Sequence, residues 1–161
     1  MGLATTARGV AAVVLPKQSR RAVERELTGR DSSRTTPAPM TNGRGDTHLR
    51  AARAAITAYL EGKSRGFNLP LDLDGQSRFR VKVWQVLQAI PYGRVRSYGW
   101  VARKIGKPRA ARAVGSACGA NPVPLLVPCH RVVAGDGSMG GFSGGLPNKR
   151  RLLRLEGLRV P

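Results

Sequence analysis

The sequence predicts an α+β protein with a small N-terminal α/β domain, residues 1–75, and a mainly helical C-terminal domain, residues 76–161. Three observations support this division. Short runs of apolar and β-branched residues near the N-terminus are typical of strands. Residues 67–75 alternate apolar residues with turn formers, so we expect an extended connector between the domains. After it, apolar residues recur at helical spacing, and two of the predicted helices form a helix-turn-helix.

The N-terminal domain begins with a predicted β-hairpin. Residues 3–6 and 10–15 are short apolar runs separated by Ala-Arg-Gly, which favours a turn between two strands. Ser19 then precedes a charged segment, residues 20–27, and a serine in this place is typical of a helix N-cap.

A long loop and an amphipathic helix complete this domain. Residues 30–46 are mostly turn formers with little to bury, so we expect them to be mobile. A helix is predicted over residues 47–61, and Gly62 ends it. Five apolar residues share its predicted inner face: Leu49, Ala52, Ile56, Tyr59 and Leu60.

Three helices are predicted in the first part of the C-terminal domain. Apolar residues recur at helical spacing from Phe79 to Ile90, and Pro91 ends that helix. Residues 97–106 form a second helix that closes on a glycine, and Pro108 fits the first position of a third. A glycine-containing turn joins the second and third helices, which predicts a helix-turn-helix.

The third of these helices carries small side chains after Arg112, among them Ala113, Gly115 and Ser116. Small side chains let a backbone approach closely in a narrow groove of DNA, which favours DNA contact through this helix. The alternative is that alanine is simply the best helix former and these positions pack inside the domain. Spacing alone leaves both interpretations open.

The charge of the chain indicates a polyanionic partner. It holds 28 Lys and Arg against 9 Asp and Glu, a formal net charge of +19. Residues 1–69 contribute +7 and residues 70–161 contribute +12, so the second half is the expected nucleic-acid surface.

The composition also argues against a metal-binding, a membrane-bound and a secreted protein. Two cysteines and two histidines at uncommon spacings predict no metal site, and we expect the cysteines to be reduced thiols. We expect no membrane association, because no apolar segment reaches spanning length and residues 10–15 are too short for a signal-peptide core. The expected location is therefore the cytoplasm, or the nucleus if the organism is eukaryotic.

The clearest chemical signal is a cysteine and a histidine behind an apolar run, residues 123–127. The run predicts a buried strand or extended segment, and Cys129 and His130 could then be ordinary core residues. Pro128 has no amide hydrogen, so the strand should end there and Cys129 can project into a cleft. His130 and Arg131 are groups of the kind that stabilise a thiolate, the reactive form of cysteine.

An activated nucleophile needs a base that a third group orients. Glu156, the last acidic residue of the sequence, ends a helix predicted over residues 147–156. The helix dipole disfavours a carboxylate at this end, so we expect a compensating partner and choose His130. On an extended segment His130 and Cys129 point in opposite directions, so we expect the histidine to act through a water.

Six short stretches stand in order across residues 76–157 of the chain. They are Ile90-Pro-Tyr-Gly-Arg-Val-Arg-Ser-Tyr98, Arg112-Ala-Val-Gly, Asn121-Pro-Val-Pro, Pro128-Cys-His-Arg-Val, Ser143-Gly-Gly and Leu152-Leu-Arg-Leu-Glu-Gly157. In this order and spacing they resemble the O6-alkylguanine-DNA alkyltransferases, also called methylated-DNA-protein-cysteine methyltransferases. A match of this extent is specific, whereas Pro-Cys-His-Arg alone would only be suggestive.

The resemblance implies a ribonuclease-H-like N-terminal domain, here shortened, and a winged-helix-like C-terminal domain. In the family the N-terminal domain opens with a further strand ahead of the hairpin, and its absence would leave one sheet edge uncovered. Some members bind a structural zinc in that domain through Cys and His. This domain has no cysteine, so no metal is carried over.

For the chemistry, the resemblance implies that Cys129 accepts the alkyl group. His130 and Glu156 would form a water-linked relay that deprotonates it, and Asn121 would brace the segment before it.

For DNA, the resemblance implies that Tyr98 pushes on the target nucleotide and donates to its base. Arg112 would enter the stack in place of the flipped base. Ala113, Gly115 and Ser116 would belong to the DNA-binding helix.

For the substrate pocket, the resemblance implies that Val132 and Ser143 meet the guanine through their backbones, next to Gly144. Phe142 stands where many members carry Tyr, which keeps an aromatic wall but drops a hydroxyl.

The implied function is DNA repair by direct reversal. A monomer would bind double-stranded DNA containing O6-alkylguanine from the minor groove, flip the base and transfer the alkyl group irreversibly to its own cysteine, without a cofactor. A non-catalytic alkyltransferase-like binder or a helix-turn-helix regulator is the alternative, but neither would need Cys129. A cysteine hydrolase would need an oxyanion hole and would leave the helix-turn-helix unexplained.

Overall fold

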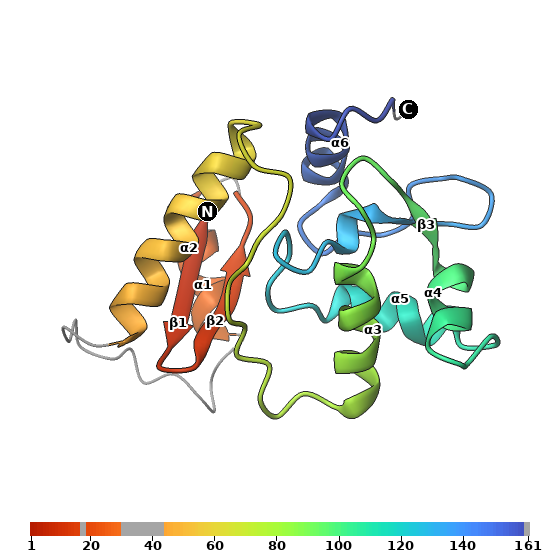
Figure 1. Cartoon of the computed structure of the whole chain (residues 1–161), viewed down its shortest axis with the longest axis horizontal. Helices are drawn as coiled ribbons and strands as arrows, with labels where there is room; N and C mark the ends of the chain where they lie inside the picture. The colour runs from red at the N-terminus through yellow and green to blue at the C-terminus, as the bar shows by residue number, and fades with distance from the viewer. Residues whose placement is uncertain (17–18, 30–43, 160–161) are drawn as a thin grey trace. The chain divides into compact units, whose positions relative to one another are not determined.

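The computed structural model describes residues 1–16, 19–29 and 44–159, which divide into two compact units, Met1–Leu73 and Asp74–Pro161 (Figure 1). Within these ranges helices combine with two small two-stranded sheets, so the protein is α+β. No helix in the described part of the chain is long and apolar enough to cross a bilayer.

The first unit is built on the hairpin that the sequence predicts. β1 (Gly2–Thr6) pairs antiparallel with β2 (Gly9–Val14), with a bulge between Ala4 and Thr5. The β2 strand is almost entirely buried, and its side chains form much of the core of this unit.

The connector also joins this sheet, which the sequence did not indicate. The Val10 amide donates to the Pro70 carbonyl over 2.9 Å, and the Asp72 amide donates to the Val10 carbonyl over 2.9 Å. Gly9 allows this approach, because a Cβ there would lie 2.3 Å from the Pro70 oxygen and its φ is +149°. The β2 edge of the hairpin is therefore covered by a short parallel bridge at Leu71.

Two helices, α1 (Arg20–Gly29) and α2 (Arg44–Leu60), pack against the hairpin (Figure 1). The predicted cap of α1 is confirmed, since the Ala22 amide donates to Ser19 Oγ over 3.2 Å. The predicted start of α2 was wrong by three residues, because 44–46 belong to the helix and not to the loop. The rest of the predicted loop, residues 30–43, lies outside the described residues.

The inner face of α2 is narrower than predicted. Ala52, Ile56 and Tyr59 are buried, whereas Leu49 and Leu60 are 37% and 41% exposed. Successive residues are rotated by about 100° around a helix axis, which places both leucines at the rim of the apolar arc. Counting apolar residues therefore overestimated the buried face.

The second unit contains four helices among its described residues. Their bounds are α3 (Arg78–Gln88), α4 (Tyr98–Lys104), α5 (Ala111–Gly119) and α6 (Leu146–Leu155). A short parallel pair joins β3 (Arg96–Ser97) to β4 (Val132–Val133). Serines cap α3 and α4: Ser77 Oγ accepts from the Arg80 amide and Ser97 Oγ accepts from the Trp100 amide.

The helix-turn-helix is present as α4 and α5, which pack on each other and on α3. The predicted start of its second helix at Pro108 was wrong, because α5 begins at Ala111. Residues 107–110 form a turn instead, closed by a hydrogen bond of 2.9 Å from the Ala110 amide to the Lys107 carbonyl. A proline suits this turn as well as it suits a first helical position, so its place in the sequence did not distinguish the two.

The predicted strand over residues 123–127 was also wrong. The segment forms a compact turn in which the Val127 amide donates to the Val123 carbonyl over 3.0 Å, and Leu125 takes a φ of +81°. Prolines at 122, 124 and 128 remove the amide hydrogens that a strand ladder needs. The apolar side chains are buried as predicted, but around a turn and not along a sheet.

Trp84 on α3 joins two helices of the second unit. It is fully buried, and its indole Nε1 donates to the Ala117 carbonyl on α5 over 2.9 Å. This bond fixes the far end of α5 against α3.

Trp84→Phe keeps an aromatic ring in the core but removes this donor and leaves the Ala117 carbonyl without it. We expect the free energy of unfolding, measured by urea denaturation, to fall by about 1–3 kcal/mol. Trp100→Phe, on a partly exposed face of α4, is the matched control and should cost much less. Equal losses in the two variants would contradict a specific role of the indole bond.

Candidate active site

Cys129 opens a 3-10 helix, Cys129–Arg131, directly after Pro128. Its side chain is buried, and the residue is only 3% exposed. The turn that precedes it and the Cys129 amide, which donates to the Val127 carbonyl over 2.8 Å, fix the position of the thiol.

Asn121 connects this turn to the sulfur. Its Nδ2 donates to the Val127 carbonyl over 2.9 Å and to Cys129 Sγ over 3.1 Å, while its Oδ1 accepts from the Val123 amide over 3.0 Å. The fully buried amide therefore holds the turn closed and places a donor on the sulfur. A donor in this place favours the thiolate over the thiol.

The carboxylate of Glu156, which follows α6, is buried behind the cysteine. His130 Nε2 lies 2.6 Å from Glu156 Oε1, so the contact predicted between these residues is present. The sequence missed the second partner: Arg131 Nε lies 3.1 Å from Oε1 and 3.0 Å from Oε2. The Gly93 amide donates to Oε2 over 2.8 Å.

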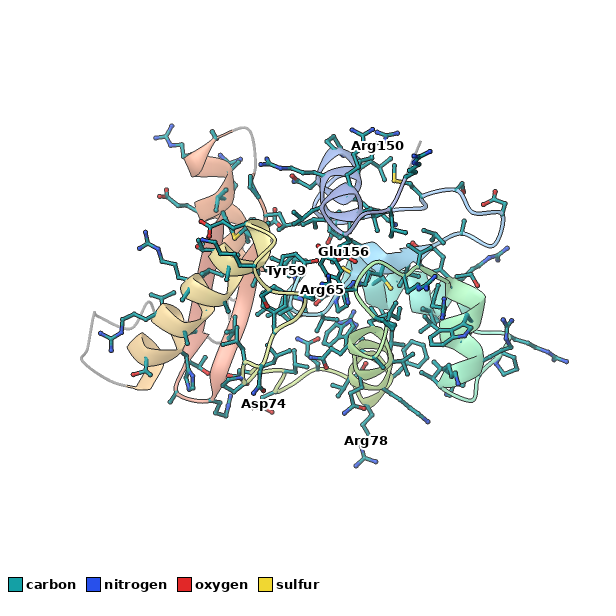
Figure 2. All side chains as sticks on the ribbon, turned by 45° about the horizontal axis from the view of Figure 1, so that its top comes forward. Tyr59, Arg65, Asp74, Arg78, Arg150 and Glu156 are labelled. Atoms are coloured by element: carbon teal, nitrogen blue, oxygen red, sulfur yellow. The ribbon has the colours of Figure 1, made fainter. Side chains whose placement is uncertain are left out.

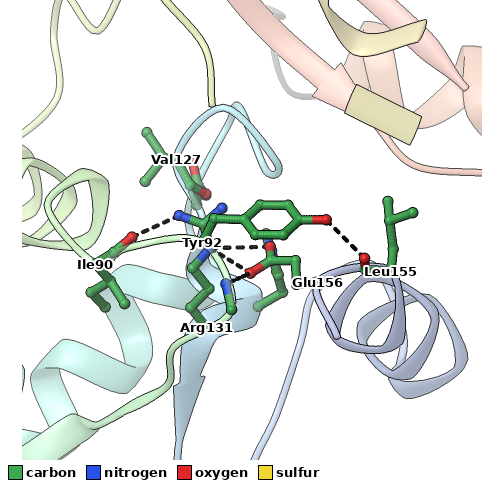
Figure 3. A network of polar contacts seen from close by, with 9 residues as sticks. Ile90, Tyr92, Val127, Arg131, Leu155 and Glu156 are labelled. Carbon is green, nitrogen blue, oxygen red and sulfur yellow. Dashed lines mark hydrogen bonds and ion pairs between the residues drawn. The ribbon is translucent and has the colours of Figure 1, made fainter. Parts of the chain in front are cut away.

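Arg131 was expected to act on the thiol, but its guanidinium binds elsewhere. Besides binding Glu156, the guanidinium donates through Nη1 to the Ile90 carbonyl over 2.7 Å (Figure 3). Tyr92 adds a bond of 2.8 Å from its hydroxyl to the Leu155 carbonyl (Figure 3). The turn after α3, the 3-10 helix and the end of α6 are thus joined by one buried polar network.

This network sets the proton positions. Burial lowers the pKa of His130, and the hydrogen bond to Glu156 opposes that shift without reversing it. His130 is therefore neutral near pH 7. The Glu156 carboxylate, which Arg131 keeps ionised, can only accept hydrogen bonds, so the neutral imidazole donates to it through Nε2–H and carries its lone pair on Nδ1. Nδ1 has no hydrogen-bond partner among the described residues. The ring can accept a proton on the side away from Glu156.

Cys129 opens onto a cavity of about 270 Å³. Its lining residues are Tyr98, Gly115, Cys118, Gly119, Cys129, Gly141 and Phe142. Four of them were predicted from the sequence, whereas Val132, Ser143 and Gly144 do not line this cavity. Tyr98 reaches across it, with its hydroxyl 3.4 Å from the Gly141 carbonyl.

The sequence missed Cys118 and Gly119, although a signal was there. They follow Gly115 by three and four positions, so one face of α5 carries all three. Gly141 gave no such signal, because a glycine-rich loop does not reveal which of its residues faces a cavity.

Lys149 is a further residue that the sequence missed. It is fully buried on α6, and its ammonium donates to the carbonyls of Val132, Met139 and Gly141. Burial lowers the pKa of Lys149. Lys149 thereby fastens the glycine-rich loop to α6 and β4, and it binds the carbonyl of Val132, a residue whose backbone was predicted to meet the substrate.

The outer face of α5 is polar and small. Arg112, Ala113 and Ser116 are exposed, while Val114 and Ala117 point into the core. The alternative that all the small residues pack inside is therefore wrong for Ala113 and Ser116. Their exposed face leaves the backbone of α5 open to close approach.

Positive charge surrounds this face. Exposed basic side chains on α4, α5 and the turn between them are Arg103, Lys104, Lys107, Arg109 and Arg112. No acidic residue occurs between Asp74 and Asp136 in the sequence. Figure 2 shows a further basic side chain, Arg78, pointing outward from α3, whereas the carboxylate of Glu156 lies inside the same unit and does not offset the surface charge. Such a surface favours a polyanion.

Residues 78–158 match the family described as 6-O-methylguanine DNA methyltransferase, DNA binding domain. The chain belongs to the 6-O-methylguanine DNA methyltransferase family. Every candidate site residue named above lies within the matched range.

Two relatives show how far the similarity extends. A methylated-DNA-protein-cysteine methyltransferase of Mycolicibacterium paratuberculosis is 51% identical over 106 residues, which are 66% of this chain and 64% of that protein. One of Methanosarcina acetivorans is 44% identical over 109 residues, 68% of this chain and 69% of that protein. The chain thus matches just under two thirds of the length of the first relative.

Among solved structures, this family member resembles Mycobacterium tuberculosis OGT in complex with DNA. The TM-score is 0.75 at 38% sequence identity, and the similarity covers 96% of this chain and 84% of that one.

The lowered pKa of His130 predicts how stability depends on pH in this family member. An unfolded histidine takes up a proton near pH 6.5, whereas the folded His130 does so only at a lower pH. The unfolded state binds more protons between these values, so the free energy of unfolding should fall as the pH drops below about 6.5. His130 should contribute at most about 1.4 kcal/mol per pH unit to this slope.

Urea denaturation between pH 7.5 and pH 5.5 measures this slope. His130→Gln should flatten it, and His48→Gln is the matched control that should not. An unchanged slope in His130→Gln would contradict the assignment, as would an NMR ring signal of His130 that titrates at about pH 6.5 in the folded protein.

Proposed function

We propose that this chain repairs DNA by direct reversal, as a methylated-DNA-protein-cysteine methyltransferase. It binds double-stranded DNA containing O6-alkylguanine and transfers the alkyl group to Cys129. The observation that carries the proposal is a buried thiol that opens onto a cavity, with a neutral histidine, a carboxylate and an arginine behind it. The names of the relatives support the same activity.

The domains have separate roles in this proposal. The unit from Asp74 onward is the DNA-binding and alkyl-acceptor domain, with a winged-helix-like arrangement of α4, α5 and the short β3 and β4 pair. The first unit is a ribonuclease-H-like domain, in which α1 and α2 pack on a hairpin.

The reaction begins with the loss of the thiol proton. Cys129 gives its proton, through a water, to Nδ1 of His130, while Nε2 keeps its own proton and donates a hydrogen bond to the Glu156 carboxylate. Arg131 and the Gly93 amide keep Glu156 ionised, so the imidazolium that forms has a carboxylate beside it. Asn121 donates to the sulfur and stabilises the thiolate.

The thiolate then attacks the alkyl carbon. A C–S bond forms as the bond from carbon to guanine O6 breaks, and the electron pair of that bond remains on the guanine. The hydroxyl of Tyr98, which faces the cavity, donates to the base and offsets this charge. Phe142 is the aromatic wall, and the backbones of Val132 and Ser143, next to Gly144, meet the guanine.

A thioether is stable and no cofactor restores the thiol, so each monomer acts once. A non-catalytic alkyltransferase-like binder is less favoured, because it would not need Cys129 or the network behind it.

DNA reaches the site through α5. The small exposed face formed by Ala113 and Ser116, with Gly115 beside it, enters the minor groove, and the surrounding basic residues hold the phosphates. Arg112 on the first turn of α5 fills the stack that the flipped base leaves.

Incubation with duplex DNA that contains O6-methylguanine should add one CH2 unit to the protein mass and no more. Peptide mapping should place it on Cys129, and Cys129→Ala should gain no mass while still binding DNA. Multiple additions, or a methyl group on Cys118, would rule out the proposal.

Arg112→Lys tests how the base is flipped. If Arg112 only neutralises a phosphate, either cation suffices and transfer is unchanged. If its planar guanidinium fills the stack, Lys cannot replace it. The loss should then be largest on fully paired duplex, because unpairing costs a few kcal/mol that a single strand does not require.

The measurement is the transfer rate of Arg112→Lys on duplex and on single-stranded DNA, each relative to the unaltered protein. Arg109→Lys, in the exposed turn before α5, is the matched control. The same relative rate on both substrates would exclude the stacking role.

A further inference from the structure

The cavity contains both cysteines of the sequence. Cys129 and Cys118 line it together, and both are nearly closed off from solvent elsewhere, at 3% and 7% exposure. The proposed transfer uses only Cys129, so the second thiol has no role in that chemistry.

Asn121 connects the two cysteines. Its backbone amide donates to the Cys118 carbonyl over 3.3 Å, and its side chain donates to Cys129 Sγ over 3.1 Å. Cys118 stands in the last turn of α5, next to Gly119. A glycine at a helix end lets the backbone adjust, which would help the two sulfurs to meet.

The two thiols differ in reactivity. Burial and the negative charge of Cys129 raise the pKa of Cys118 to about 12, and Lys149 only partly opposes this. Cys118 is therefore a neutral thiol at pH 7 and does not compete for the first reaction. Cys129 has the donor from Asn121 on its sulfur and the base behind it, so it reacts first.

We propose that Cys118 is a resolving thiol that rescues Cys129 from oxidation by hydroperoxides. The Cys129 thiolate attacks a peroxide oxygen, the O–O bond breaks, and Cys129 becomes a sulfenic acid while hydroxide leaves. The Cys118 sulfur then attacks the oxidised sulfur. An S–S bond forms, and the hydroxyl leaves as water with the proton of Cys118.

This step would protect the acceptor. Without a second thiol, a sulfenic acid proceeds to sulfinic and sulfonic acids, which ordinary thiols do not reduce. A disulfide is reopened by thiol reductants, so the oxidised protein keeps its capacity for later use. The cavity admits a small oxidant, because its volume is several times the roughly 30 Å³ that one water occupies.

The experiment treats the full chain with hydrogen peroxide and follows both thiols by mass. No Lys or Arg lies between the cysteines, so trypsin leaves both in one peptide, residues 113–131. We expect this peptide to lose two hydrogens and to stop reacting with N-ethylmaleimide. After a second cleavage at Leu125 or Leu126, the two halves should stay joined until dithiothreitol is added.

Cys118→Ser and Cys118→Ala are the test variants. After the same treatment their Cys129 should carry sulfinic acid, and dithiothreitol should restore little methyl transfer, compared with each variant's own untreated activity. The unaltered protein should recover most of its activity.

Two results would overturn the proposal. One is a sulfinic acid at Cys129 of the unaltered protein while Cys118 remains a free thiol. The other is equal recovery with and without Cys118. The mass measurements need no DNA, so a failure of methyl transfer would not be confused with a failure of the disulfide.

Discussion

The buried carboxylate of Glu156 is the constraint on which the site depends. Removing an ionised carboxylate from water costs several kcal/mol unless it is paired and hydrogen-bonded. Here the guanidinium of Arg131, the imidazole of His130 and the Gly93 amide all point at its two oxygens. None of these groups comes from α6, so the carboxylate is tolerated only when the turn after α3 and the 3-10 helix are in place.

The contacts of Glu156 also set the protonation of the His130 ring. A carboxylate held by Arg131 stays anionic, which orders the tautomer of His130 and directs its basic nitrogen away from Glu156. Asn121 holds the turn and the sulfur together, because its Nδ2 donates to the Val127 carbonyl and to Cys129 Sγ, and its Oδ1 accepts from the Val123 amide. The sulfur is thus held by the Asn121 amide, and the Glu156 carboxylate independently holds the neighbouring imidazole.

Local signals allowed much of the fold to be predicted. Apolar residues at helical spacing located α3, Ser19 located the start of α1, and the hairpin followed from two short runs and a glycine. Prediction failed where the same residues are compatible with two kinds of local structure. Pro108 suits a turn or a helix start, and the run at 123–127 is buried around a turn because its prolines cannot pair in a sheet. Burial of Lys149 was missed because the sequence Lys-Arg-Arg resembles a solvated helix face, although positions 149, 152, 153 and 156 share the inner side of that helix.

The dependence on Glu156 also bears on how the protein is made. His130 and Glu156 are 26 positions apart, so the segment with the nucleophile emerges from the ribosome well before its carboxylate. Until α6 docks, the imidazole of His130 lacks the carboxylate that orders its ring. If Cys129 accepts the alkyl group as proposed, an incompletely folded chain keeps that thiol unreacted until α6 has docked.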